Sequence, residues 1–163
     1  MGAPPLWYPQ TVGATDRQPR PIGREHELAA LERFLAANGE PAVQLLTGDP
    51  GIGKTTLWQC ALAGVAGTTL QARASEAEAQ LSFAGLADLL ASVDTALLSA
   101  LPPPQRYALA VALRRETPDD GPPEELAVSL GFLGTLALLA EHGSVVVAVD
   151  DVQWLDRATV DVL

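Results

Sequence analysis

The pattern of apolar and polar residues along the chain predicts two kinds of segment, amphipathic helices and short buried strands. Apolar positions three and four residues apart predict a first helix that opens within residues 21–27 and stops at Asn38-Gly39. Further helices are predicted over 54–64 and 124–141, with shorter helical segments between 82 and 115 that three prolines at 102–104 interrupt. Continuous apolar runs bounded by turn residues predict three strands, at 42–46, 68–72 and 144–149.

The order of these segments predicts the fold class. Strands that alternate with helical stretches are typical of an α/β protein, in which helices flank a parallel sheet. Only three strands are visible, and a parallel sheet of three strands has two poorly protected edges. We therefore expect the sheet to be incomplete and the chain, which stops at Leu163 within a predicted helix, to be cut off.

Composition narrows the range of functions. The 163 residues have a mass of 17.0 kDa, which suits a single domain. A formal net charge of −10 argues against binding DNA or RNA through their phosphates. The single cysteine, Cys60, excludes an internal disulfide framework and a cysteine-based zinc site, and it fits a reducing cytoplasm.

Regions of the chain differ in composition. Residues 1–20 are rich in proline and have no apolar run behind a basic start, which predicts a flexible leader rather than a signal peptide. Residues 21–163 are expected to form the domain, with a linker-like break at the acidic, proline-rich segment 116–123. The longest apolar run, 126–140, is shorter than the ~20 residues that span a bilayer, so we expect a buried helix and no membrane segment.

The strongest chemical signal is a glycine-rich loop between the first predicted strand and the helix that follows it. Residues 48–55 match the pattern G-x-x-x-x-G-K-[ST], and Lys54 is the only lysine of the chain. Backbone amides of such a loop and the positive end of the next helix bind phosphate oxygens, Lys54 would contact the β- and γ-phosphates, and Thr55 would bind Mg²⁺. The predicted nucleotide-binding residues are Gly48, Asp49, Pro50, Gly51, Ile52, Gly53, Lys54, Thr55 and Thr56, of which Thr56 is also suited to capping or packing in the first helical turn.

A second candidate element follows the last predicted strand, which ends in Asp150-Asp151. The carboxyl ends of parallel strands are where such sheets bind ligands. Asp150 would hold Mg²⁺ through a water molecule, and Asp151 is the candidate catalytic residue that orients the attacking water or takes its proton. Because the Asp151 side chain is short, hydrolysis should be slow. The alternative is a pair of aspartates that merely ends a strand at a turn.

The choice of nucleotide depends on a motif that the chain lacks. Ras-type GTPases read guanine with the sequence Asn-Lys-x-Asp, which is excluded because Lys54 is the only lysine and Asn38 the only asparagine. ATP or ADP with Mg²⁺ is therefore the expected ligand, although guanine selectivity through other contacts stays open.

Three stretches of the sequence together resemble one family. They are Ile22-Gly23-Arg24-Glu25-x-Glu27, the phosphate loop GDPGIGKTTL, and VVVAVDDVQWLDRAT at Val145–Thr159. These stretches are similar to the ATPase module of STAND-class signalling NTPases of the AAA type, and above all to the large ATP-binding LuxR-type regulators of bacteria. A middle phrase from Ser75-Glu76 to Leu86 is similar as well, so the resemblance covers about residues 21–163.

The resemblance implies a P-loop NTPase three-layer sandwich and a nucleotide switch. Such proteins rest with ADP bound, exchange it for ATP on sensing a signal and assemble, and hydrolysis resets them. The resemblance also places Gly23-Arg24-Glu25 near the base and ribose, which makes Arg24 a candidate nucleotide-binding residue. The alternative for this stretch is a helix N-terminus whose glutamates complement the helix dipole. Trp154 is expected to pack, and Arg157 to be a surface residue or an arginine finger.

Several functions stay open. The first is Mg²⁺-dependent ATP binding, with slow hydrolysis or none, as the switch module of a STAND/LuxR-type transcriptional regulator. The second is a non-catalytic remnant or interaction fragment of such a regulator, or the ATPase module of an adenylyl cyclase or sensor kinase relative. A kinase-like phosphotransferase is a third, for which the lid arginines and an acceptor-site motif are missing. The expected partners are the nucleotide and another copy or a parent-type regulator, with no direct contact to DNA or membrane.

Overall fold

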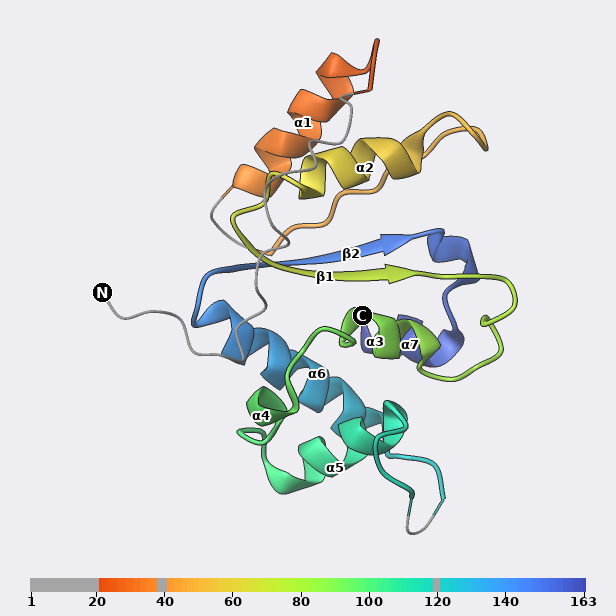
Figure 1. The fold of residues 1–163 in the computed structure, drawn as a ribbon. Helices are drawn as coiled ribbons and strands as arrows, with labels where there is room; N and C mark the ends of the chain where they lie inside the picture. Colours follow the sequence, from red (N-terminus) through yellow and green to blue (C-terminus); the bar gives the residue numbers. More distant parts are fainter. Residues whose placement is uncertain (1–20, 38–40, 119–120) are drawn as a thin grey trace.

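The structure is a computed structural model that describes residues 21–37, 41–118 and 121–163. Figure 1 shows its helices and strands, which follow the predicted order except that no strand lies between the first two helices. The elements are α1 (Glu25–Ala36), α2 (Lys54–Leu62), β1 (Gly67–Arg73), α3 (Ala84–Leu89), α4 (Thr95–Leu98), α5 (Pro103–Ala112), α6 (Glu125–Ala140), β2 (Ser144–Asp150), the 3-10 helix η1 (Val152–Trp154) and α7 (Arg157–Val162). The predicted leader at 1–20 and the predicted helix stop at Asn38-Gly39 lie outside the described residues.

The two strands form a parallel sheet. β1 pairs with β2 in a register that runs from Gly67 opposite Ser144 to Arg73 opposite Asp150. The helices α3 to α6 connect the strands, because parallel neighbours require a long crossover. The pair confirms the predicted strands at 68–72 and 144–149 and, with its flanking helices, the α/β fold class.

Helices lie on both faces of this sheet. Figure 1 shows α1 and α2 on one side and α3, α6 and α7 on the other. Along β1, Leu70 and Ala72 are buried in the main core, while Gln71 and Arg73 are exposed on the opposite face. The described chain therefore has the three layers expected of a P-loop NTPase sandwich, around a sheet of two strands.

The prediction of a strand at 42–46 is wrong. These residues have no regular secondary structure, and Val43 and Leu45 keep 96% and 64% of their surface exposed. The apolar run predicted burial between other strands, but a strand is stable only beside a partner. In the described part of the chain the sheet consists of β1 and β2 alone. Within residues 42–46, only the half-buried Leu46 packs against α1 and α2.

The main hydrophobic core lies between the sheet and the helices α3, α5 and α6. Leu70 of β1, Leu86 of α3 and Leu109 of α5 are fully buried there, beside Val128 and Leu139 of α6. Burial of one such leucine contributes roughly 1.5–3 kcal/mol. The apolar run predicted a buried helix, but α6 buries only one face, and its Leu126, Leu130 and Leu133 are 63%, 42% and 57% exposed. None of the described helices has the length and apolar character needed to cross a membrane.

A smaller core joins α1 to α2. Leu28 and Leu31 of α1 pack against Leu57 and Ala61 of α2, and all four side chains are buried. Because Lys54 begins α2, this packing places the start of α1 beside the glycine-rich loop.

The three prolines at 102–104 do interrupt the helical region, and they also begin the next helix. Pro103 and Pro104 occupy the first positions of α5, where a backbone amide would have no helical acceptor.

Candidate functional site

The glycine-rich loop has the backbone geometry of an anion-binding turn. Gly48, Gly51 and Gly53 have φ angles of +151°, +77° and +91°, which residues with a side chain rarely adopt. The amide of Ile52 donates to the carbonyl of Asp49 over 3.3 Å and closes the turn. The backbone conformation therefore accounts for the glycines of the sequence pattern.

The first turn of α2 presents unbonded amides beside this loop. Gly53 precedes the helix in a left-handed conformation and provides no side-chain cap. The first backbone bond of the helix runs from the Leu57 amide to the Gly53 carbonyl, at 3.0 Å. Within the described residues, the amides of Lys54, Thr55 and Thr56 therefore have no acceptor. These amides and the helix dipole favour an anion at this end of α2.

Lys54 folds back over the loop. Its Nζ donates to the carbonyl oxygens of Gly48 and Asp49, at 2.8 and 3.1 Å. The ammonium group is thereby held beside the turn, where a phosphate group would compete with these carbonyls for its protons.

One hydrogen bond joins the loop to the end of β2. Thr55 Oγ1 donates to Asp150 Oδ2 over 2.8 Å, although the two residues are 95 positions apart. Asp150 is only 8% exposed, and its Oδ1 accepts from the Asp151 amide at 3.1 Å. The structure thus brings together the two residues that the sequence proposes as Mg²⁺ ligands.

The donor atoms at this contact fit Mg²⁺. Hydroxyl and carboxylate oxygens are the hard donors that Mg²⁺ prefers, and the ion usually takes its remaining ligands from water and substrate phosphates. Across residues 21–37, 41–118 and 121–163, no group of three or more His, Cys, Asp or Glu side chains could hold a metal. A cation bound by Thr55 and Asp150 would therefore need further ligands from the nucleotide or from water.

Asp151 lies at the turn that follows β2. Its φ of +54° is in the left-handed region, which aspartate tolerates better than most residues. Its Oδ1 accepts from Gln153 Nε2 at 3.3 Å, and the residue is half-buried. The candidate catalytic carboxylate is thus adjacent in sequence to the proposed metal ligand, Asp150.

Arg24 contacts the loop from the start of α1. Its Nη2 donates to the carbonyl of Ile52 over 3.1 Å, and its Nη1 pairs with Glu27 at 3.3 Å. The first turn of α1 also contains Glu25, so the acidic N-terminus that was the alternative interpretation is present too. The geometry places Arg24 at the candidate site, and its contact with a nucleotide stays a prediction.

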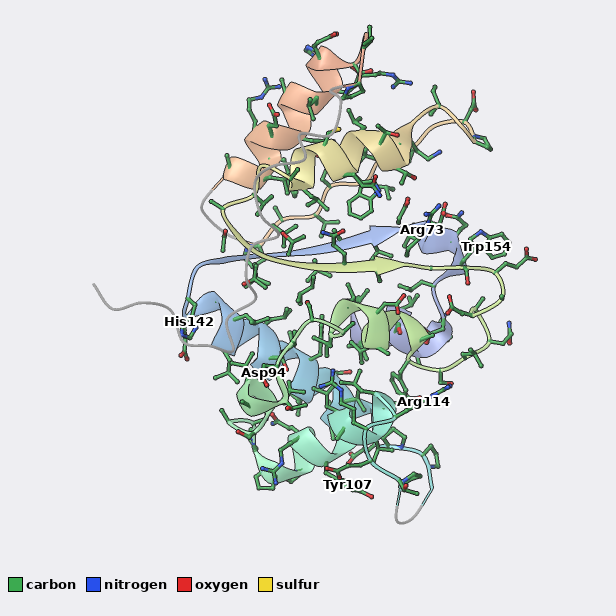
Figure 2. The ribbon with its side chains drawn as sticks, in the orientation of Figure 1. Arg73, Asp94, Tyr107, Arg114, His142 and Trp154 are labelled. Carbon is green, nitrogen blue, oxygen red and sulfur yellow. The ribbon has the colours of Figure 1, made fainter. Side chains whose placement is uncertain are left out.

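The other residues singled out from the sequence lie at the surface. Asp49, Pro50 and Ile52 of the loop are exposed, as is Thr56 in the first turn of α2. Arg157 pairs with Asp161 at 2.9 Å, and its side chain is 86% exposed. Trp154, which the sequence predicts to pack, is 38% exposed. Figure 2 shows it at the carboxyl end of the sheet.

Sequence reasoning missed two features near the site. Arg73 ends β1 directly opposite Asp150 in the strand register, and Figure 2 shows it at the same end of the sheet as Trp154. Asp156 and Thr159 are buried, with 2% and 0% of their surface exposed. Two signals in the sequence could have identified these residues. Arg73 stands at the end of a predicted strand, and Asp156 stands before a helix, where aspartate is a common N-cap residue.

Asp156 is a buried carboxylate held by neutral donors. Burial by itself raises its pKa, but hydrogen bonds from Thr159, Gly85 and Phe83 outweigh that effect, so the pKa of Asp156 lies below its ordinary value. A carboxyl group whose pKa is lowered by folding stabilises the fold above its unfolded-state pKa. That contribution is lost as the pH falls through the folded-state pKa.

We therefore expect Asp156→Asn to destabilise the fold more at neutral pH than at a pH near 3. At neutral pH the loss should be about 2 kcal/mol, since a hydrogen bond to a charged group contributes about 1.5–3 kcal/mol. Urea denaturation followed by circular dichroism measures the free energy of unfolding at these two pH values, which lie on either side of the pI of 4.4. The control, Asp161→Asn, removes an exposed ion pair and should have little effect at either pH. Equal destabilisation by Asp156→Asn at both pH values would contradict the pKa direction.

The fold and the loop define an α/β domain of the P-loop NTPase class. The AAA ATPase domain family matches the chain over residues 20–163, and the chain belongs to this family. Comparisons with curated proteins and with solved structures gave no significant match. Membership of this family indicates a nucleotide-binding domain.

Proposed function

We propose that this chain binds ATP and ADP with Mg²⁺ at residues 48–55 and acts as a nucleotide-dependent switch. The observation that carries the proposal is the hydrogen bond of 2.8 Å between Thr55 and Asp150, because it joins the phosphate loop to the acidic end of a parallel strand. Membership of the AAA ATPase domain family supports a nucleotide as the ligand. The lack of an Asn-Lys-x-Asp sequence favours adenine over guanine.

The residues of the site have distinct roles in this proposal. The loop amides would surround the phosphates, and Lys54 would donate to the terminal ones. Thr55 and Asp150 would hold Mg²⁺, which supplies charge neutralisation at the β- and γ-phosphates when bound. Arg24 would contact the nucleotide from α1, since its guanidinium already donates to the loop at Ile52.

Hydrolysis, where it occurs, would depend on Asp151. Its carboxylate would orient the attacking water or take its proton, and the left-handed turn and the bond from Gln153 would hold it in place. The short side chain of Asp151 supports a hydrolysis rate below about one turnover per second, which is the lower end of the range for ordinary enzymes. Such a rate suits a switch that resets slowly.

The finer proposal is that the chain is the ATPase module of a STAND-class regulator of the LuxR type. Segments that resemble this class meet in the structure, since Arg24 contacts the phosphate loop and Thr55 contacts Asp150. A net charge of −10 supports a module that leaves DNA binding to other domains. The partners proposed are the nucleotide and a second copy or a full-length regulator of this type, in the cytoplasm.

One observation favours a second candidate function, a non-catalytic interaction fragment. Residues 42–46 form an apolar segment that pairs with no strand of the described residues, and Val43 is 96% exposed. Exposed segments of this kind can add to the edge of a sheet in another chain.

Calorimetric titration of the full chain with ATP, ADP and GTP tests the proposal, each with Mg²⁺ and again with EDTA. We expect saturable binding of both adenine nucleotides that Mg²⁺ strengthens, and weaker binding of GTP. A chain that is folded by circular dichroism and binds no nucleotide would contradict the proposal. If that chain also associates with increasing concentration in sedimentation experiments, the interaction fragment is the better description.

A further inference from the structure

A buried clasp holds together two segments that are about 70 residues apart in the sequence. The Asp156 carboxylate accepts hydrogen bonds from the amides of Phe83 and Gly85, at 2.8 and 3.0 Å. It also accepts from the amide and hydroxyl of Thr159, at 2.9 and 2.7 Å. The same hydroxyl oxygen accepts from the Leu86 amide at 3.0 Å. Each carboxylate oxygen thus accepts two hydrogen bonds, and Asp156 and Thr159 are almost inaccessible to solvent.

The residues on the other side of the clasp are suited to it. A Cβ atom at Gly85 would clash with Leu155 Cδ1, the end of a side chain that would have to move, and would lie 3.2 Å from Thr159 Cγ2, so glycine suits this close approach. Phe83 has a φ of +63°, an uncommon conformation for an aromatic residue. The conformation orients its amide toward Asp156. A backbone strained at this point and packed this closely indicates a specific connection rather than a chance contact.

The clasp is connected to the candidate metal ligand through a short, bonded turn. Between them lies η1, in which the Trp154 amide donates to the Asp151 carbonyl at 2.9 Å and the Leu155 amide to the Val152 carbonyl at 3.2 Å. The Asp151 amide in turn donates to the Asp150 carboxylate. Asp156 therefore anchors the far end of the turn whose near end orients Asp150.

We propose that Asp156 and Thr159 are positioning residues, which fix the turn after β2 and thereby hold the Asp150 carboxylate toward Thr55. The inference rests on the proposed function, because it assigns Asp150 to Mg²⁺. Neither residue touches the nucleotide in this proposal. Their effect reaches the metal through the Asp151 amide, which binds Asp150 Oδ1 and leaves Oδ2 to face Thr55.

A matched pair of variants at Thr159 tests the proposal. Thr159→Val keeps the shape of the side chain and removes its hydroxyl, while Thr159→Ser keeps the hydroxyl; Asp156→Asn removes the charge of the carboxylate. The readout is the ratio of ATP affinity with Mg²⁺ to ATP affinity in EDTA, measured by calorimetry on the full chain. We expect this ratio to fall about tenfold in Thr159→Val and Asp156→Asn, the lower end for residues that orient metal ligands. The serine variant should keep the ratio of the wild type, and affinity in EDTA should be unchanged in variants that remain folded.

A second measurement needs no nucleotide. Hydrogen exchange of the Trp154 and Leu155 amides, compared with that of Leu109 in the main core, reports whether the clasp holds the turn. We expect exchange at Trp154 and Leu155 to accelerate about tenfold or more in the valine variant, and by a larger factor than exchange at Leu109. Unchanged exchange at the turn would overturn the proposal, whether or not the wild-type chain binds ATP. A lack of ATP binding by the wild-type chain would contradict the proposed function instead. Faster exchange with an unchanged Mg²⁺ ratio would also overturn it, because the clasp would then hold the turn without positioning Asp150.

Discussion

Replacement of Lys54 by alanine should weaken Mg²⁺-ATP binding roughly 100-fold. The ammonium group lies beside the turn, bonded to the Gly48 and Asp49 carbonyls at 2.8 and 3.1 Å, and in the proposed site it donates to the terminal phosphates. A hydrogen bond to a charged group contributes about 1.5–3 kcal/mol, and about 1.4 kcal/mol is a tenfold change in affinity. Calorimetry on the two full chains under the same salt conditions measures the difference.

The control for this prediction is Lys54→Arg, which keeps the positive charge. The guanidinium is planar and larger than an ammonium, so it should not fit the narrow turn and should restore only part of the lost affinity. Circular dichroism must show that both variants keep the wild-type fold, since Lys54 also bonds the loop itself. Wild-type affinity in a folded Lys54→Ala chain would place the nucleotide elsewhere.

Replacement of Asp150 by asparagine should abolish the effect of Mg²⁺ on ATP binding while leaving the fold intact. The asparagine keeps the size of the side chain and can still accept from Thr55, although its amide nitrogen cannot accept from the Asp151 amide as Oδ1 does. It lacks the negative charge that a divalent cation requires. Asp150 is 8% exposed, so removing its charge does not impose an additional burial penalty on the fold. We expect a ten- to hundredfold loss of the Mg²⁺ enhancement, about the range for altered metal sites.

The adjacent carboxylate provides the matched control. Asp151→Asn should leave Mg²⁺-dependent ATP binding close to that of the wild type and remove whatever slow hydrolysis the chain has, because Asp151 is proposed to act on water alone. Titrations at increasing Mg²⁺ concentration and a sensitive phosphate-release assay separate these effects. If the two variants lose the Mg²⁺ effect equally, the division of roles between Asp150 and Asp151 is wrong.

Local signals were sufficient for most of the fold. The apolar spacing that places Leu28 and Leu31 on one side of α1 acts over a few residues, as does the run of β-branched residues that becomes β2. The apolar run that becomes α6 predicted a buried helix, and one face of that helix lies in the main core. Each of these segments found a partner surface in the core, so local preference and tertiary packing agree.

Residues 42–46 show where local signals fail. The segment has the composition of a buried strand, yet Val43 and Leu45 are exposed because neither strand of the described sheet pairs with them. A strand obtains its hydrogen bonds from a neighbour, so its formation depends on a contact that the segment itself does not specify. Trp154 is a smaller example, since its exposure follows from its place at the end of the sheet rather than from its apolar character.

The sequence by itself determined the chemistry of the loop. The glycines, Lys54 and Thr55 lie within eight consecutive residues, and the positive φ angles and the helix start that they require are local properties of the backbone. Only the tertiary structure decided that Thr55 meets Asp150 and that Asp156 binds the amides of Phe83 and Gly85. These contacts join residues 71 to 95 positions apart, and they form because β1 pairs in parallel with β2 and the main core fixes the helices around them. Such long-range contacts depend on the packing of the whole domain, which no short segment of the sequence encodes.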